Sequence, residues 1–279
     1  MGSGLAMNDD DEGVPRGPGA LFNGERNAIV ERAYATPDVA RSRQAMVAAL
    51  AVAPGDRIIE IGSGPGFMTV DLARAAGPDG HVDAFDISPG MVDLTRRRSA
   101  ETGLDNVTVG IGDAAALPVA DGAYAAAAMG QVLEYMTDPA AGVAEIHRVL
   151  APGGRAVILD IDWATLVWHS EDSQRLARVV QAAHAFRPEP LVARRIPALA
   201  TTAGLRLLNA DVLVTVNTDF GDDTLGRWMF ELMRMSAPET GAITRQEVDA
   251  AFREFQHLSE QGAYYYSVNR CLFLVEKPA

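Results

Sequence analysis

The spacing of hydrophobic residues changes along the chain and marks out its secondary structure. Between residues 25 and 50 apolar residues recur at helical spacing, interrupted at Thr36, Pro37 and Asp38, which predicts two helices. From residue 57 onward, short apolar runs alternate with helical patterns, as in a parallel sheet covered by helices on both faces. The expected strands are 57–61, 81–86, 107–111, 124–129 and 155–160, and the expected helices between them are 66–76, 89–102 and 139–150.

The chain beyond residue 160 is expected to alternate less regularly. Its expected elements are helices at 172–186 and 194–203, a strand at 212–218, helices at 224–235 and 245–259, and a β-rich tail at 264–276. Helices that follow the fifth strand would lie over the carboxyl ends of the strands, where ligands bind in such sheets.

These elements predict the domain organisation. Residues 25–279 are expected to form one domain, with an N-terminal helical lid and a substrate-side helical insertion at about 161–203. Residues 1–24, acidic and then rich in Gly and Pro, are expected to form a flexible arm, with 1–6 a remnant of cloning.

Composition narrows the range of partners. The 279 residues carry a formal net charge of -13 and no stripe of Lys or Arg, so a nucleic-acid partner is not expected. No apolar stretch approaches the length of a membrane span, and no signal-peptide pattern is present. The single cysteine, Cys271, cannot form an intrachain disulfide, which fits a reducing cytoplasm. The oligomeric state stays open, a homodimer included.

The run Glu-Ile-Gly-Ser-Gly-Pro-Gly at 60–66 follows an apolar strand and opens a helix. Its glycines allow a tight turn and bring the backbone close to a ligand. The spacing is G-x-G-x-G, which differs from the G-x-G-x-x-G of dinucleotide-binding enzymes, and no P-loop lysine follows. Glu60 places a negative charge at the strand end, which favours a ligand with an ammonium group over a pyrophosphate.

Two aspartates follow at the ends of the next strands. Asp86 lies twenty residues beyond Gly66, where a carboxylate accepts hydrogen bonds from ribose hydroxyls, although a residue of the turn before Ser88 and Pro89 is the alternative. Asp113, in the run 112–118, could accept from an adenine amino group. Together with the helix–turn–strand junction at 149–155, the ordered motifs indicate a nucleoside-containing ligand.

With these motifs the chain resembles the class I S-adenosylmethionine-dependent methyltransferases, specifically the small-molecule group similar to ubiquinone/menaquinone-type enzymes. The resemblance covers roughly half of the chain, at 57–66, 81–91, 112–118 and 131–160. It implies an α/β, Rossmann-like fold: a seven-stranded, mostly parallel sheet with its last strand antiparallel, helices on both faces, and a helical lid. It also implies S-adenosyl-L-methionine as cofactor and S-adenosyl-L-homocysteine as product.

The resemblance assigns cofactor-binding residues by motif position. The loop beginning at Glu60 would approach the methionine part, Asp86 and Ile87 the ribose, Met91 the adenine face, and Asp113 the adenine edge. Tyr34 would cover the cofactor, with helix packing as the alternative. The full expected set is Tyr34, Glu60, Gly62, Ser63, Gly64, Gly66, Asp86, Ile87, Met91, Gly112, Asp113, Ala114, Met129 and Gln131.

Candidate catalytic residues come from other segments. Methyl transfer from a sulfonium depends mainly on positioning, and a base is needed only for a hydroxyl or a carbon acid. His169 is the candidate base and Glu134 a second catalytic candidate, each with a structural role as the alternative. Tyr135, Trp163 and Trp168 are expected at the substrate pocket, with packing as the alternative. No metal site is expected, because no cluster of His, Cys and Asp has ligand spacing.

We therefore expect a cytoplasmic methyltransferase acting on a small organic molecule in bacterial specialised metabolism. The main alternative is an S-adenosylmethionine-binding enzyme of the same fold that catalyses a non-methylating reaction such as a cyclisation. A protein or nucleic-acid methyltransferase and a regulatory binding module are further alternatives. The residues at 130–133 lack the Asn/Asp-Pro-Pro-Tyr pattern, which argues against methylation of base amino groups. The sequence identifies neither the substrate nor the atom that is methylated.

Overall fold

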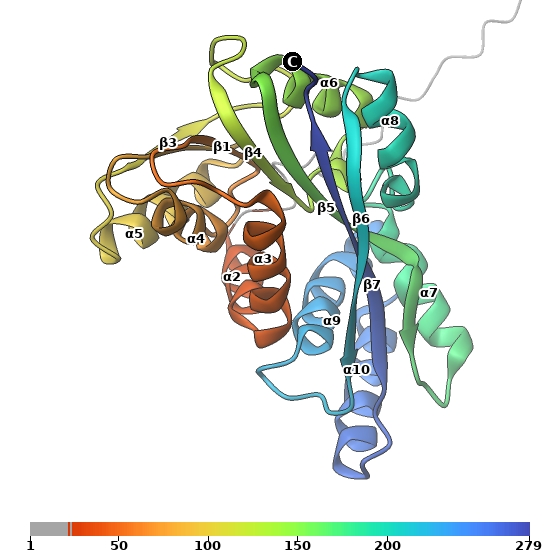
Figure 1. Cartoon of the computed structure of the whole chain (residues 1–279). Helices are drawn as coiled ribbons and strands as arrows, with labels where there is room; N and C mark the ends of the chain where they lie inside the picture. The colour runs from red at the N-terminus through yellow and green to blue at the C-terminus, as the bar shows by residue number, and fades with distance from the viewer. Residues whose placement is uncertain (1–21, 23) are drawn as a thin grey trace, which may run out of the picture.

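Seven strands form one central sheet in the computed structural model, which describes residue 22 and residues 24–279 (Figure 1). The expected arm at 1–24 lies, apart from residues 22 and 24, outside the described residues. The strand order is β3-β2-β1-β4-β5-β7-β6. The strands are β1 (Arg57–Ile61), β2 (His81–Asp86), β3 (Val107–Ile111), β4 (Tyr124–Gly130), β5 (Leu150–Trp168), β6 (Arg206–Asn217) and β7 (Tyr266–Glu276).

The strand directions confirm the predicted sheet. β1 pairs in parallel with β2 and β4, β2 with β3, and β4 with β5. Only β7 is reversed, since it pairs antiparallel with both of its neighbours, β5 and β6. The carboxyl ends of the parallel strands therefore share one edge of the sheet, where loops from separate segments meet.

Helices cover both faces of the sheet. On one face, α3 (Pro37–Leu50) and α4 (Phe67–Ala76) share an apolar core with β1 and β5. On the other, α6 (Pro139–Val149) and α8 (Ile196–Thr202) pack against a second core. Beside α4 lies α5 (Pro89–Glu101), and short 3-10 turns η1 (Leu133–Tyr135), η2 (Val192–Arg195) and η3 (Ala237–Thr240) complete the connections. In the described part of the chain, no helix is both long and apolar enough to cross a bilayer.

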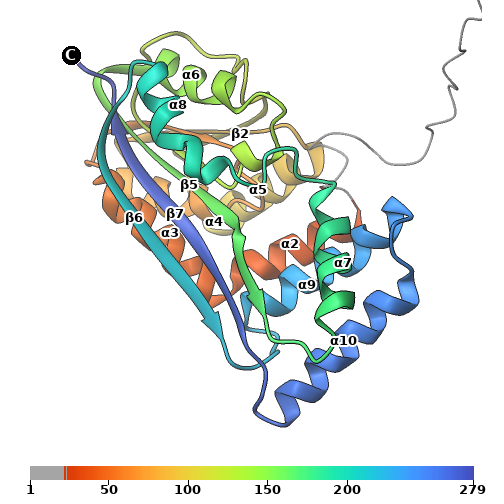
Figure 2. The same ribbon diagram turned by 90° about the vertical axis from the view of Figure 1, so that its right-hand side faces the viewer.

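The strands β5, β6 and β7 extend well beyond the other four strands, and a separate helical layer packs against their extensions (Figure 2). This layer consists of α2 (Glu25–Ala35), α7 (Ser173–His184), α9 (Leu225–Ser236) and α10 (Arg245–Glu260). Its core is rich in aromatic residues: Trp168 stacks on Phe255 with ring centroids 5.7 Å apart, and Phe230 meets Phe255 edge to face at 4.8 Å. Together these helices and strand extensions cover the carboxyl side of the sheet.

One expected boundary differs from the structure. The predicted helical insertion at about 161–203 begins as a strand, because β5 does not end near Asp160 but continues to Trp168. Its extension pairs with β7, Val167 opposite Ser267 and Trp168 opposite Tyr266. Aromatic and β-branched residues in this segment favour extended backbone, and the long β7 gives them a hydrogen-bonding partner. Helical structure resumes only at α7.

Candidate functional site

A pocket opens at the carboxyl ends of β1, β2 and β4. It holds about 670 Å³ of space free of atoms, the open mouth included. Its walls come from five parts of the chain: residue 22 with α2, the loop after β1, the β2–α5 junction, the loop after β3, and the β4–η1 segment. The lining residues are Phe22, Val30, Tyr34, Gly62, Gly64, Asp86, Ile87, Met91, Gly112, Asp113, Ala114, Gly130, Gln131, Val132, Tyr135 and Met136.

A second, narrower pocket continues from the first toward α3. Both pockets share Tyr34, Gly62, Gly130 and Gln131 as walls. The residues that line only the second one are Val39, Ser42, Arg43, Met46, Glu60, Ser63, Met68, Ala128, Leu159 and Arg270. The two pockets therefore form one elongated site with an aromatic and apolar end and a charged end.

The glycine loop is shaped by close contacts as well as by its turn. Gly62 has a φ of 77°, and a Cβ there would lie 2.2 Å from Val132 Cγ2. Gly66 has a φ of 80°, and its Cβ would lie 2.7 Å from the Thr95 Cα. Side chains rarely adopt these backbone angles, so glycine is required at both positions. The first keeps the β4 loop against the pocket, and the second lets α4 approach α5.

The charged end of the site contains Glu60 and Arg43. Glu60 is buried and accepts a hydrogen bond from the Thr69 hydroxyl, and burial raises the pKa of its carboxyl to about 8. Arg43 donates to the Tyr34 carbonyl at 2.7 Å and to Asp71 at 3.1 Å, which holds its guanidinium at the pocket wall. A carboxyl and a guanidinium on one wall suit a ligand with an ammonium and a carboxylate.

Asp86 stands between the two loops that form the apolar end. Its carboxylate accepts hydrogen bonds from the backbone N–H groups of Gly64 at 2.8 Å and Ser88 at 2.9 Å, while burial raises its pKa. These bonds fix the carboxylate at the pocket wall. Across the pocket, Asp113 accepts from the Ala115 N–H at 2.9 Å and closes its own loop.

Gln131 has a strained backbone at the junction of the two pockets. Its φ is 57°, a left-handed conformation that is uncommon outside glycine and concentrates at functional sites. Its N–H donates to the Leu159 carbonyl at 2.7 Å, and its side-chain oxygen accepts from the buried Arg270 guanidinium. Because a guanidinium only donates, the amide oxygen must face Arg270. The amide NH₂ group therefore faces away from Arg270, and no described residue accepts a hydrogen bond from it.

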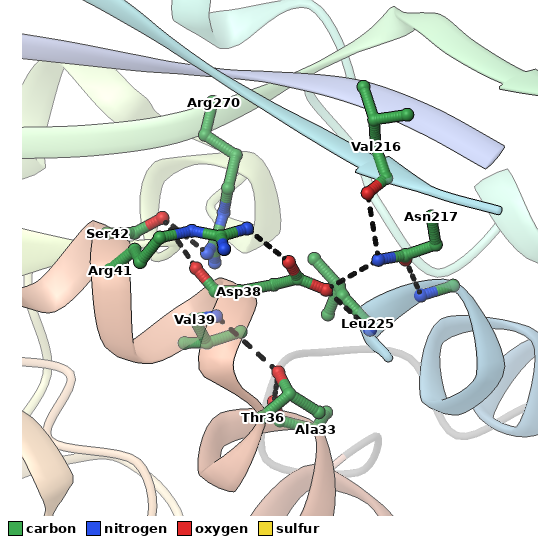
Figure 3. A network of polar contacts seen from close by, with 11 residues as sticks. Ala33, Thr36, Asp38, Val39, Arg41, Ser42, Val216, Asn217, Leu225 and Arg270 are labelled. Atoms are coloured by element: carbon green, nitrogen blue, oxygen red, sulfur yellow. Dashed lines mark hydrogen bonds and ion pairs between the residues drawn. The ribbon is translucent and has the colours of Figure 1, made fainter. Parts of the chain in front are cut away.

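Arg270 is anchored in turn by α3. Its second guanidinium nitrogen donates to the Ser42 hydroxyl at 2.9 Å, and that hydroxyl donates to the Asp38 carbonyl at 3.3 Å (Figure 3). Arg270 is 1% exposed although it lies in a strand of apolar residues. A hydrogen-bonded path thus connects Gln131 at the pocket with the first turn of α3.

Comparison with known proteins identifies the domain that carries this site. The model of the methyltransferase domain family matches residues 58–154. Residues 58–154 form a class I methyltransferase domain. The match includes the glycine loop, Asp86, Asp113 and the β4–η1 segment, so it covers most of the walls described above.

Individual relatives match part of this chain and part of their own length. An uncharacterised 37.1 kDa protein in transposon TN4556 of Streptomyces fradiae is 42% identical over 133 residues, or 47% of this chain and 38% of that protein. The demethylmenaquinone methyltransferase of Symbiobacterium thermophilum is 37% identical over 108 residues, or 38% of this chain and 43% of that protein. The matched segment thus spans less than half the length of either relative.

Solved structures extend the likeness to nearly the whole chain. The [4+2]-cyclase SpnF superposes with a TM-score of 0.60 at 18% identity, covering 96% of this chain and 99% of that one. Phosphoethanolamine N-methyltransferase 2 of Haemonchus contortus, solved with S-adenosyl-L-methionine, gives a TM-score of 0.59 at 16% identity, covering 91% and 57%. At such identities the likeness establishes the fold.

The structure brings most of the residues expected at the cofactor site to the walls of the two pockets. Two of them lie elsewhere. Met129 is fully buried in the core under α6, because side chains alternate along β4 and it is Gly130 that faces the pocket. Gly66 lines neither pocket and instead permits the close packing of α4 against α5.

The structure contradicts the assignment of His169 as the candidate base. It is exposed, its N–H donates to the Tyr265 carbonyl at 2.9 Å, and it lines neither pocket. The physical reason is the length of β5: at about 3.3 Å per residue, nine further residues carry His169 some 25–30 Å past the strand end expected at Asp160.

Two of the three aromatic residues expected at the substrate pocket are also placed elsewhere. Trp168 is packed within the aromatic core and donates to the Tyr264 hydroxyl at 2.8 Å. Trp163 is buried one layer behind the pocket, where its indole N–H donates to Glu134. Tyr135 does line the pocket, in edge-to-face contact with Phe22 at 5.1 Å. Glu134 is fully buried beside it.

Several wall residues were missed by sequence reasoning. Arg43 and Val30 sit in helices whose amphipathic pattern does not distinguish a pocket wall from solvent or core. Arg270 had a usable signal, since it is a lone charge in the mostly apolar run at 268–275, in a strand with one face buried and the other half-buried. Such a charge is retained only with specific partners, and it marks a functional position.

Proposed function

We propose that the elongated site binds S-adenosyl-L-methionine and that the protein transfers its methyl group to a small organic molecule. The observation that carries this proposal is the order of groups along the site: Arg43 and Glu60 at one end, Asp86 in the middle, and Asp113 at the other. This order fits an amino acid carboxylate and ammonium, a ribose, and an adenine. The family match at residues 58–154 supports the same ligand.

The residues have separate roles in holding this cofactor. Glu60 would face its ammonium and Arg43 its carboxylate. Asp86, already fixed by two backbone N–H groups, would accept from the ribose hydroxyls, while Ile87 and Met91 pack on the adenine face. When bound, the cofactor supplies an electrophilic methyl carbon on a sulfonium. Gln131, at the junction of the two pockets, would lie beside that methyl group.

The remaining task of the protein is to align the acceptor with the methyl carbon and to keep water out. Tyr34, Val30 and Phe22 cover the pocket from the N-terminal side. Alignment of two bound reactants is a large source of rate enhancement when the geometry is held rigidly. The strained Gln131 backbone and its bond to the buried Arg270 provide such rigidity.

A titration of the purified protein tests cofactor binding. S-adenosyl-L-methionine and S-adenosyl-L-homocysteine should both bind in isothermal titration calorimetry. Asp86→Asn should weaken both by about 10-fold or more, because hydrogen bonds to a charged group contribute about 1.5–3 kcal/mol. Asp93→Asn, on the exposed side of α5, is the matched control and should leave both affinities unchanged. Absence of binding by the unaltered protein would refute the proposal.

Methyl transfer itself is tested with cofactor labelled in the methyl group and a panel of small acceptors. Labelled product with equimolar S-adenosyl-L-homocysteine supports transfer. The alternative is a non-methylating reaction such as a cyclisation, and it is favoured by the superposition on the [4+2]-cyclase over 96% of this chain. It predicts product without label and cofactor recovered intact.

We also propose a domain organisation, a substrate class and a cellular location. Residues 25–279 act as one domain in which α2 and the 161–203 segment flank the acceptor side. The substrate is a small molecule of bacterial specialised metabolism, and the formal charge of -13 argues against nucleic acid. The protein works in the cytoplasm, consistent with its single cysteine.

A further inference from the structure

The strand β6 forms one edge of the sheet and leaves one of its sides unpaired. It is twelve residues long and pairs with β7, and no other strand in the described part of the chain pairs with it. The backbone N–H and C=O groups along its outer side therefore have no partner strand. Figure 2 shows β6 along the margin of the molecule. The opposite edge strand, β3, is only five residues long.

The side chains of β6 are largely apolar and exposed. Ten large apolar side chains are exposed among the described residues, and five of them belong to β6: Leu207, Leu208, Val212, Val214 and Val216. Because side chains alternate along a strand, the three valines project from the same face of the sheet. We refer to them as the valine row. The residues between and after them, Thr215 and Asn217 among them, point to the other face, where those two are buried.

The valine row lies on a face of the sheet that helices cover only in part. Ala210, just before the row, is opposite Phe273, which is buried in the core under α6 and α8. Val214 is opposite Asn269, further along β7, and 59% of its surface is exposed. The valine row thus begins where the covering helices end. Exposed apolar side chains beside an unpaired strand edge are typical of a surface that contacts another protein.

Features that usually protect an edge strand are scarce on β6. Residues 206–217 contain no proline, glycine or lysine, and their ionisable side chains are those of Arg206 and Asp211. Arg206 forms an ion pair with Glu276 of β7 at 2.8 Å. A bulge at Leu208 interrupts the pairing with β7 near the start of the strand, and the rest of β6 is regular. Such an edge readily accepts a further strand.

We propose that β6 is the contact surface of a homodimer, in which the β6 strands of two copies pair antiparallel around a twofold axis near Val214. Identical strands match in this arrangement, because Val212 of each copy meets Val216 of the other and the two Val214 side chains meet at the axis. Six valines then form one apolar strip, and the unpaired backbone groups of both edges gain partners. No residue of β6 lines either pocket, so the dimer does not depend on the proposed cofactor.

The distribution of charge favours a second copy over a partner of another kind. With a formal net charge of -13, the protein as a whole would attract a basic partner. The valine row carries no charge, and β6 contributes one basic and one acidic residue, so a partner recognised by its charge would bind elsewhere. A second copy supplies an edge strand of the same length and an apolar row with the same spacing.

The size of the contact predicts a dimer of moderate affinity. At about 3.4 Å per residue, β6 is about 40 Å long, and a strip about 15–20 Å wide along it covers roughly 600–800 Å² of each copy. Stable interfaces bury about 800 Å² per partner, so this contact lies at the lower end of specific interfaces. The like charges of the two copies oppose association. We therefore expect a dissociation constant in the micromolar range.

Sedimentation velocity of the purified full chain tests the dimer. Between about 1 and 200 μM protein, the sedimentation coefficient should rise from the value of a monomer to that of a dimer. Raising NaCl from about 50 to 500 mM should tighten association at least threefold, because salt screens the repulsion between the copies, whereas an interface built from ion pairs would weaken. A monomer at every concentration would overturn the proposal and would point to a strand of a different protein as the occupant.

The variant Val214→Lys tests whether β6 is the interface. It should weaken dimerisation at least 10-fold, because two ammonium groups would meet at the twofold axis. Ile111→Lys is the matched control: Ile111 is 58% exposed, close to the 59% of Val214, but it lies on the opposite edge strand, β3. It should leave the dissociation constant within twofold. Circular dichroism and urea unfolding check that both variants fold. Equal effects of the two substitutions would overturn β6 as the interface.

A mixture of the variants Val214→Lys and Val214→Glu tests the twofold geometry. Each variant alone places like charges at the axis, whereas a mixed dimer places an ammonium beside a carboxylate. The mixture should therefore associate at least 5-fold more tightly than either variant alone. The corresponding mixture of Ile111→Lys and Ile111→Glu should show no such gain. A Val214 mixture that associates no more tightly than its components would overturn the antiparallel pairing.

Discussion

The carboxylate of Asp38 accepts a hydrogen bond from the side-chain amide of Asn217 at 2.8 Å, across 179 positions of sequence (Figure 3). The same oxygen accepts from the Leu225 N–H at 3.0 Å, at the start of α9. Asp38 thereby joins α3, which lines the cofactor pocket, to the corner between β6 and the helical layer. Through Ser42 and Arg270 the connection continues to Gln131. The layer beyond the sheet and the pocket wall are thus held in one arrangement.

Asp38→Ala should therefore destabilise the fold, because the Asp38 carboxylate is buried and holds these groups together. The substitution leaves the Asn217 amide and the Leu225 N–H without their charged acceptor, and we expect a loss of about 2–3 kcal/mol in unfolding free energy. Arg41→Ala removes the other partner of Asp38, but that side chain is 66% exposed, so its loss should stay below about 1 kcal/mol. Urea unfolding of both variants measures the difference. Equal losses of unfolding free energy would show that the hydrogen bonds from Asn217 and Leu225 to Asp38 do not stabilise the fold.

The glycine loop offers a second matched pair. Gly62 and Gly64 both have positive φ, but only at Gly62 would a Cβ collide with a neighbour, the Val132 side chain. Gly64→Ala should lose about 1–2 kcal/mol from backbone strain alone. Gly62→Ala should lose at least about 1 kcal/mol more and should also weaken binding of S-adenosyl-L-homocysteine, because Val132 lines the pocket.

Truncation of Val132 tests the cause of that difference. In the double variant Gly62→Ala with Val132→Ala, the collision is absent, so the second substitution should restore part of the loss caused by the first. A double-mutant cycle on unfolding free energy would give a favourable coupling between the two sites. Purely additive effects would show that Gly62→Ala destabilises the fold through backbone strain and not through a collision with Val132.

The sequence correctly predicts the residues whose position in the fold depends on the local pattern around them. The glycine loop, Asp86 and Asp113 follow strands directly, so their place at the carboxyl edge follows from the strand order. His169 was misplaced because the end of β5 is set by pairing with β7, whose residues lie about one hundred positions further along the sequence. Arg270 was missed as a wall residue for the same reason: it lies 139 positions from Gln131 in sequence and meets it only through the topology.

Glu60 should make the stability of the cofactor-free protein depend on pH. Its pKa is about 8 in the folded protein and near 4.5 when exposed. Between these values the folded state keeps a proton that the unfolded state has released, so the contribution of Glu60 to unfolding free energy falls as pH rises. The slope from this group approaches about 1.4 kcal/mol per pH unit in that window. Urea unfolding of Glu60→Gln from pH 5 to pH 8 should show a shallower decline than the unaltered protein; parallel curves would contradict the shifted pKa.

Cofactor binding should release that proton. An ammonium group beside Glu60 favours the ionised carboxylate, so at pH 6.5, where the amino group of the ligand is protonated, binding of S-adenosyl-L-homocysteine should expel close to one proton. Calorimetry in phosphate and in Tris, whose ionisation enthalpies differ, counts the protons. 5′-Methylthioadenosine lacks the amino acid part and should release far fewer. Equal release by both ligands would mean that the ammonium does not reach Glu60.

Truncation of two neighbouring residues at the end of β5 should change the unfolding free energy by very different amounts. Trp168 is buried, stacks on Phe255 and donates to the Tyr264 hydroxyl, so Trp168→Ala should lower the unfolding free energy by about 3–5 kcal/mol. His169 is exposed, and His169→Ala should change it by less than about 0.5 kcal/mol. His169→Ala should also leave the affinity for S-adenosyl-L-methionine and the rate of methyl transfer unaltered, since the side chain lies outside both pockets. A large loss of rate in this variant, with stability intact, would return His169 to the active site and would require that β5 bend back toward the cofactor.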